Sequence, residues 1–129
     1  MKLEAFLQDS GFAYEAPRSL YVHVPFCAQK CAYCDFHSRP ANHSESSAYA
    51  KALARRVAAS RGLFPEGLST IYVGGGTPTV LETEDFRTLM EALGSLAGPE
   101  TAEWTVEANP ESLDRVRIEI LAEAGATRL

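Results

Sequence analysis

Three short apolar runs, each followed by a stretch with helical spacing, constrain the fold of this chain more than any other feature. The runs occupy 19–24 (SLYVHV), 69–73 (STIYV) and 103–107 (EWTVE). They are rich in β-branched and aromatic residues and end close to proline or glycine, which is typical of strands. Strand and helix in repeated alternation predict an α/β fold with parallel strands, either a barrel or a doubly wound sheet.

The segments after these strands predict helices over about 44–62, 83–97 and 114–125, because their apolar residues recur at helical spacing. Serines 44, 46 and 47 offer N-caps for the first helix, and Thr83 offers one for the second. The expected buried faces are Tyr49, Leu53 and Val57 in the first, Phe86, Leu89, Met90, Leu93 and Leu96 in the second, and Val116, Ile120, Leu121 and Ala124 in the third.

The domain organisation follows from these repeats. Residues 1–18 have mixed polarity and are an expected N-terminal extension, and residues 19–129 are the expected domain. Thr127–Leu129 reads as the start of a fourth strand. A complete parallel barrel needs ~200 residues or more. We therefore expect 19–129 to be an incomplete domain, with three strand–helix units and the beginning of a fourth.

Composition and charge exclude several classes of protein. Hydrophobic residues make up 46% and charged residues 22%, which is typical of a globular domain with a core. The formal net charge of −5 provides no general basic surface, so nucleic acid is not an expected partner. The sequence has neither a membrane-length apolar run nor a secretory signal pattern, so an integral membrane protein is not expected. The three cysteines cannot all pair, which favours a cytoplasmic location where thiols stay reduced.

All three cysteines, Cys27, Cys31 and Cys34, lie directly after the first predicted strand. Three thiolates on one short loop can converge on a single inorganic centre, and in a cubane iron–sulfur cluster they leave one iron open to a substrate. A structural zinc site is the alternative, with His37 as fourth ligand or with His23 nearby. A disulfide with a spare thiol is a third interpretation, less favoured in a chain without a signal.

Two more unusual segments follow the other two strands. Gly74-Gly75-Gly76-Thr77-Pro78 comes after the second, and three glycines allow a ligand to approach bare backbone. Glu107-x-Asn109-Pro110 ends the third, where the Glu107 carboxylate could accept hydrogen bonds from a ligand. An ordinary turn and a surface carboxylate are the simpler alternatives. Since the carboxyl ends of parallel strands share one edge, all three segments point to a single pocket.

The segments SLYVHVPFCAQKCAYCDF, TIYVGGGTPTVL and TVEANPESL, in this order, resemble the radical S-adenosylmethionine (SAM) superfamily. Within it they resemble the branch that holds oxygen-independent coproporphyrinogen III dehydrogenase and the heme chaperone HemW. The resemblance covers residues 19–129 and implies the N-terminal part of a partial TIM barrel, (β/α)6. It also implies a [4Fe–4S] cluster and SAM as cofactors, with reductive cleavage of SAM to methionine and a 5′-deoxyadenosyl radical.

The resemblance also implies roles for individual residues. Cys27, Cys31 and Cys34 would hold the cluster, and SAM would chelate its open iron through amino and carboxylate groups. The expected SAM contacts are Tyr21, Tyr33 beside the adenosyl group, Gly75, Gly76 and Thr77 at the methionine end, and Glu107 at a polar group of SAM. The expected partners are SAM, heme or a porphyrin, and a reducing electron donor.

Two departures from the dehydrogenase pattern favour the heme chaperone group. The dehydrogenase has a fourth cysteine where this chain has Phe36, and it tends to have an aspartate where this chain has Asn109. We therefore expect a heme chaperone that keeps the cluster and the SAM site. Oxidative decarboxylation of coproporphyrinogen III is the alternative activity, and a zinc-stabilised binding module is the third.

Overall fold

The computed structural model describes residues 15–129, so residues 1–14 of the expected extension lie outside the described part of the chain. A parallel sheet has the strand order β1 (Ser19–Val24), β4 (Thr70–Gly75), β5 (Glu103–Val106). Each strand is followed by a helix: α2 (His43–Ala59), α3 (Thr83–Gly94) and α4 (Arg115–Ala124). The predicted alternation of parallel strands and helices is confirmed.

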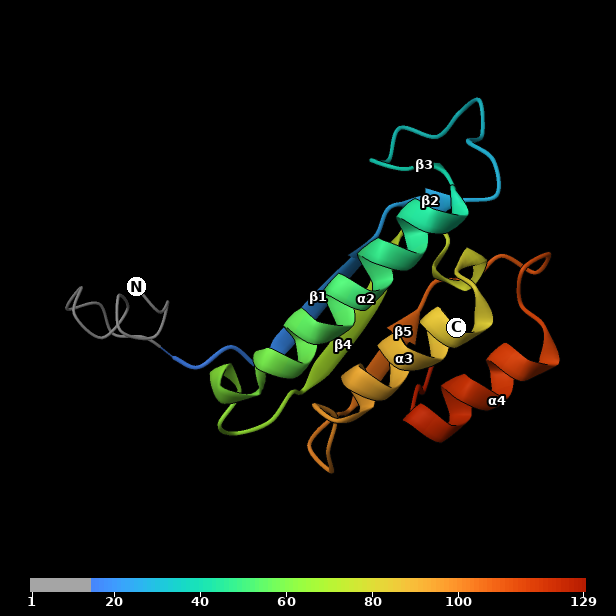
Figure 1. The fold of residues 1–129 in the computed structure, drawn as a ribbon. Coiled ribbons are helices and arrows are strands. Elements are labelled where there is room, and N and C mark those ends of the chain that lie inside the picture. Colours follow the sequence, from blue (N-terminus) through green and yellow to red (C-terminus); the bar gives the residue numbers. More distant parts are fainter. Residues whose placement is uncertain (1–14) are drawn as a thin grey trace, which may run out of the picture.

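The order of the strands in the sheet is their order along the chain, and the three helices lie on the same face of the sheet (Figure 1). A doubly wound sheet reverses its strand order and covers both faces, so this arrangement is the opening of a (β/α) barrel. Arg128 forms a parallel bridge with Thr105 of β5, next to β5 as the expected fourth strand would lie. Within residues 15–129, the helices are too short or too polar to cross a bilayer.

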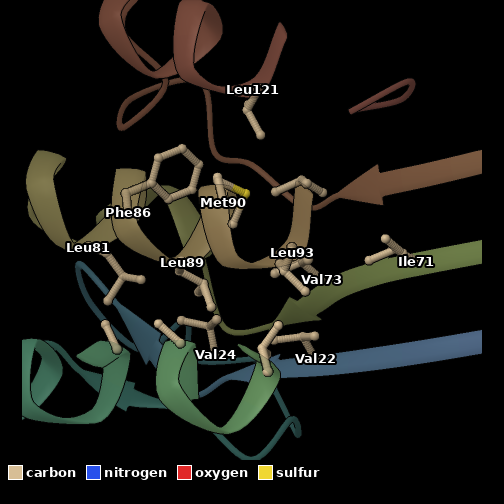
Figure 2. Packing of buried hydrophobic residues seen from close by; sticks show 14 of the residues in the cluster. Val22, Val24, Ile71, Val73, Leu81, Phe86, Leu89, Met90, Leu93 and Leu121 are labelled. Carbon is tan, nitrogen blue, oxygen red and sulfur yellow. The ribbon is translucent and has the colours of Figure 1, made fainter. Parts of the chain in front are cut away.

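The hydrophobic core lies between the sheet and its helices. Figure 2 shows side chains of α3, among them Phe86 and Met90, between the strand valines and Leu121 of α4. The strand contribution is in register, because Val22 pairs with Val73 and Val73 with Val106, and all three are buried. The buried face predicted for α3 is confirmed, since Phe86, Leu89, Met90, Leu93 and Leu96 are all buried.

The other face of the sheet is the one that would line the inside of the barrel, and it carries polar and aromatic side chains. Successive strand residues point to opposite faces, so the residues between the core valines share this face. Tyr21, Tyr72 and Thr105 form one row across the three strands. His23 and Gly74 form the next row toward the carboxyl edge.

Several helix details differ from the sequence expectations. Asn42, not a serine, caps α2, because its side chain accepts a hydrogen bond from the Glu45 amide. Thr83 lies inside α3 and makes no cap, whereas Asp114 and Gly125 end α4 at its two termini as expected. Val116 is 43% exposed, and Arg117 of the same turn of α4 is the side chain that faces the neighbouring segment. Four short elements were not predicted: β2 (Phe26–Cys27), β3 (Arg39–Pro40) and the 3₁₀ turns η1 (Arg61–Leu63) and η2 (Pro78–Val80).

Candidate functional site

The cysteine loop, residues 27–38, leaves the carboxyl end of β1 and is closed at its base by main-chain hydrogen bonds. The Arg39 amide donates to the Pro25 carbonyl at 2.9 Å, and the Ala41 amide donates to the Cys27 carbonyl at 2.8 Å. These bonds pair β2 with β3 in parallel. The loop therefore starts and ends at one place on the sheet edge.

Side chains then fix the returning arm of the loop. Lys30 Nζ donates to the carbonyls of Phe36 and Ser38 at 3.0 and 3.2 Å. His23 Nε2 lies 3.0 Å from the His37 carbonyl, and since a carbonyl can only accept, Nε2 donates. Three consecutive carbonyls of the arm are thus bound by two side chains.

The three cysteines are free thiols on this loop, with Cys27 and Cys34 half-buried and Cys31 exposed. The Cys34 amide donates to the Cys31 carbonyl at 3.0 Å, which folds the chain between them into a tight turn. Within residues 15–129, no three histidine, cysteine or carboxylate side chains lie close enough to hold a metal ion. The thiols fit an iron–sulfur or zinc centre by donor type, but the structure gathers neither the three cysteines nor the zinc set with His37.

Hydrogen bonding to Cys31 raises the pKa of Tyr33, with smaller contributions from the charge of Cys31, from burial and from the charge of Cys34. The Tyr33 side chain is 90% exposed. Tyr33 is part of the cysteine loop and does not line the pocket described below.

The glycine run joins β4 to the start of the cysteine loop. The Gly76 amide donates to the Val24 carbonyl at 2.8 Å, and the Thr77 amide donates to the Phe26 carbonyl at 2.6 Å. Thr77 Oγ1 donates to Cys27 Sγ at 3.7 Å. The second unusual segment is therefore attached directly to the first.

Each of the three glycines is required by a group of the protein itself. A Cβ at Gly74 would meet the Glu107 carboxylate at 2.7 Å, and a Cβ at Gly76 would overlap the Phe26 backbone. Gly75 has φ of +110°, and a Cβ there would overlap the His23 ring. The run is not an ordinary turn, since its bare backbone is covered on one side by the other two segments.

Glu107 follows β5 and is held by the glycine run. Its amide donates to the Val73 carbonyl at 2.9 Å. Its carboxylate accepts from the Tyr72 hydroxyl at 2.7 Å and from the Gly75 amide at 3.1 Å. The hydrogen bond to Glu107 raises the pKa of Tyr72, with smaller contributions from burial and the negative charge of Glu107. Glu107 is therefore a half-buried, oriented acceptor and not a free surface carboxylate.

Tyr21 lies on the same face as Tyr72, and their rings stack with centroids 6.0 Å apart. Its hydroxyl is 3.1 Å from His23 Nδ1. Tyr21 is 58% exposed toward the open side of the sheet. A continuous set of contacts therefore runs from Glu107 through Tyr72 and Tyr21 to His23 and the cysteine loop.

A pocket of about 510 Å³ opens where the three segments meet. The cysteine loop contributes Phe36, the glycine run contributes Gly76 and Thr77, and the segment after β5 contributes Glu107 through Pro110; Leu129 completes the lining. Of the expected site residues, Gly76, Thr77 and Glu107 line this pocket. Gly75 and Cys27 are hydrogen-bonded to lining residues, Gly75 to Glu107 and Cys27 to Thr77. Tyr21 lies on the adjoining sheet face, and Cys31, Tyr33 and Cys34 are not part of the lining.

Sequence reasoning did not place Tyr72 and His23 in the hydrogen-bond network of this site, nor Phe36 in the lining of its pocket. It did place the segment Glu107-x-Asn109-Pro110 at the pocket, and Asn109 and Pro110 line it. The alternation of side chains along a strand could have indicated Tyr72, because it lies two residues before Gly74 and therefore on the same face of the sheet. The position of Tyr72 beside Tyr21 depends on strand register, which periodicity alone does not give.

Comparisons with known proteins identify relatives of the chain. The sequence model of the radical SAM superfamily matches residues 21–129. Heme chaperone HemW of Bacillus subtilis (strain 168) is 36% identical over 115 residues, which are 87% of this chain and 30% of that protein. Oxygen-independent coproporphyrinogen III oxidase of Paracoccus denitrificans (strain Pd 1222) is 39% identical over 114 residues, 85% of this chain and 25% of that protein. The chain thus spans about 30% of the length of the curated relatives it matches. No solved structure gives a significant match.

Proposed function

Because this chain belongs to the radical SAM superfamily, we propose that Cys27, Cys31 and Cys34 ligate a [4Fe–4S] cluster and that SAM binds beside it. Membership of the superfamily implies the cluster and SAM as cofactors. The positions at which this chain holds them are our proposal. We place the cluster at the cysteine loop and SAM in the adjoining pocket.

One observation carries this proposal: the ends of three neighbouring parallel strands line a single pocket. Thr77 supports the link to the cluster, because its amide and hydroxyl contact Phe26 and Cys27 while its side chain lines the pocket. A ligand in the pocket therefore lies against the strand end that carries the cysteines. The loop must close further to bring the three thiolates to one centre.

The residues of the chain bind and orient SAM in this proposal. Glu107 accepts hydrogen bonds from an ammonium or ribose hydroxyl, and the backbone at Gly75, Gly76 and Thr77 borders the methionine end. Tyr21 and Tyr33 supply aromatic surface for the remaining part of SAM. A bound and reduced cluster would supply the electron for cleavage of the sulfonium C–S bond, and the residues of the chain would position SAM and exclude solvent.

For the protein as a whole we propose a heme chaperone that binds heme or a porphyrin and accepts electrons from a reducing donor. Several relatives named heme chaperone HemW, 35–36% identical in Bacillus subtilis and Escherichia coli, support this choice. Phe36, which stands where the dehydrogenase has a fourth cysteine, lines the pocket and also supports the choice of a heme chaperone. We also propose a cytoplasmic location, because all three thiols are free.

A second candidate is oxidative decarboxylation of coproporphyrinogen III, which the 39% identical oxidase of Paracoccus denitrificans favours. The purified protein, reconstituted anaerobically, is supplied with SAM, reductant and coproporphyrinogen III, and the products are followed by mass spectrometry. Deoxyadenosine without decarboxylation, together with retained heme, is expected for the chaperone. Loss of two carboxyl groups would establish the second candidate.

The ligand set is tested by two matched variants of the loop. Cys31→Ala should abolish cluster assembly, because three ligands leave no replacement, whereas His37→Ala should leave the iron content unchanged. Iron, sulfide and zinc are measured after anaerobic purification and reconstitution. A full iron complement in Cys31→Ala would contradict the ligand set, and zinc that is lost in His37→Ala would establish the zinc module instead.

A further inference from the structure

Two partly buried contacts join the segment after β4 to the segment after β5, through residues that do not line the pocket. Thr79 of η2, which is fully buried, has its hydroxyl 2.7 Å from the Ser112 hydroxyl. Arg117 of α4 donates from Nη2 to the Leu81 carbonyl at 2.6 Å. Its side chain is only 13% exposed, whereas that of Arg115 on the same helix is 91% exposed.

The hydroxyl contact can be traced donor by donor. Ser112 Oγ donates its single proton to the Asn109 carbonyl, 3.2 Å away. When Ser112 donates to this carbonyl, Thr79 is the donor of the 2.7 Å contact with Ser112. The Ser112 amide also donates to the same carbonyl at 3.0 Å. Asn109, a residue of the pocket lining, is thus tied through Ser112 to Thr79.

The guanidinium contact fixes the other end of the same segment. Asp114 caps α4 by accepting from the Arg117 amide at 2.8 Å, and it also accepts from Arg117 Nη1 at 2.7 Å. Because Nη2 of the same group reaches the Leu81 carbonyl, the first turn of α4 is anchored to the end of η2. The loop between β5 and α4 is therefore held both in its middle and at its end.

The tied segments carry two walls of the pocket. Gly76 and Thr77 directly precede η2, and residues 107–110 are separated from Ser112 only by Glu111. The spacing between these walls therefore depends on Thr79, Ser112 and Arg117. Neither contact involves the cysteine loop. The two contacts together, which we call the tie, therefore act on the pocket separately from the metal ligands.

We propose that Thr79, Ser112 and Arg117 are positioning residues that set the width of the ligand pocket. This inference rests on the proposed function only in taking SAM as the ligand. Loss of one tie removes a hydrogen bond that contributes about 1 kcal/mol, so each single variant should weaken SAM binding about three- to tenfold. The cluster content should not change, because the cysteine loop is not touched.

The test compares Thr79→Val, Ser112→Ala and Arg117→Met with Arg115→Met as the control. Val keeps the shape of Thr79 and removes only its hydroxyl, and Arg115 has an exposed partner, Glu119, that lies outside the tie. SAM affinity is measured by anaerobic calorimetry on protein of matched iron content. Hydrogen exchange of the main-chain amide at position 112 is measured without SAM, and it should be faster in the three variants and unchanged in Arg115→Met.

The two measurements separate this inference from the proposed function. Faster exchange with weaker SAM binding supports it, and Arg117→Lys should restore part of the affinity by keeping one donor for the Leu81 carbonyl. Unchanged exchange, or faster exchange with unchanged SAM affinity, overturns it. If the wild-type protein with an intact cluster binds no SAM, the proposed function fails, and so does the assignment of these residues to a SAM pocket.

Discussion

The contrast between Gly75 and Gly125 isolates one atomic contact of the site. Both have positive φ, +110° and +100°, but only at Gly75 would a Cβ overlap another side chain, that of His23. Gly125→Ala should therefore cost the backbone strain alone, about 1–2 kcal/mol of unfolding free energy. Gly75→Ala should cost about 1–3 kcal/mol more through overpacking. Denaturant unfolding measures both, and equal losses would mean that the His23 ring moves aside freely.

The hydrogen bond between Tyr72 and Glu107 makes a prediction about pH. It raises the pKa of Tyr72 above its ordinary value of about 10. A raised pKa in the folded state contributes stability below the unfolded pKa, and this contribution is lost as pH rises through the folded pKa. The relevant window therefore lies above pH of about 10.

Glu107→Gln should lower the Tyr72 pKa toward its ordinary value, because the negative charge and the strong acceptor are both removed. Tyrosinate absorbance measures this titration, and Tyr72→Phe identifies which transition belongs to Tyr72. A Tyr72 titration that is the same in wild-type and Glu107→Gln would show that the carboxylate does not control this hydroxyl.

At the residue scale, the sequence predicted the features that depend only on residues near one another in the chain. Asp114 and Gly125 end α4 as expected, because an aspartate before and a glycine after an apolar face have few competing interpretations. Asn42 was missed as the cap of α2, because three serines just after it offer the same chemistry. The contact of Tyr72 with Tyr21 was missed because it depends on cross-strand register.

At the scale of the element, two isoleucines of α4 test which face of the helix is buried. Ile120 is 2% exposed and Ile118 is 48% exposed on the same helix. Ile120→Ala should cost about 2–5 kcal/mol of unfolding free energy, because it leaves a cavity against α3. Ile118→Ala should cost less than about 1 kcal/mol. Similar losses in denaturant unfolding would mean that α4 is rotated from the orientation described.

Periodicity predicted the extent of the helices better than their first turns. Ile120 and Leu121 are buried as expected, but Val116 is exposed. In the first turn of α4 it is Arg117, bound to the Leu81 carbonyl, that turns toward the neighbouring segment. A polar side chain facing inward cannot be found by an apolar pattern. The contact of Arg117 with the Leu81 carbonyl therefore could not be predicted from the sequence.

At the scale of the whole molecule, the sequence predicted parallel strand–helix units but not their order in the sheet. Periodicity describes each element alone, so a barrel and a doubly wound sheet remained open. The register of Ile71 with Leu20 on one side and Trp104 on the other orders the strands as in a barrel. The edge where the cysteine loop, the glycine run and Glu107 meet was predicted, since it follows from parallel strands alone.

Removal of the metal should leave this architecture intact. The core cluster contains no cysteine, and its buried residues come from the sheet, the three helices and the segments between them. Treatment of the reconstituted protein with an iron chelator should therefore preserve the helical circular dichroism signal. Domains whose folding depends on a structural zinc site unfold without it. Cooperative loss of helix on chelation would place this chain among them.

The pairing of β2 with β3 has a consequence for how metal is captured. The two main-chain bonds at the base of the cysteine loop hold its ends together without any contribution from the cysteine side chains. The conformational entropy of closing the loop is therefore lost when the sheet edge folds. Because the loop ends are fixed, the three thiolates would meet a cluster at the high effective concentration of groups held on one short segment. Only the short spans between the sulfur atoms would remain to be ordered around it.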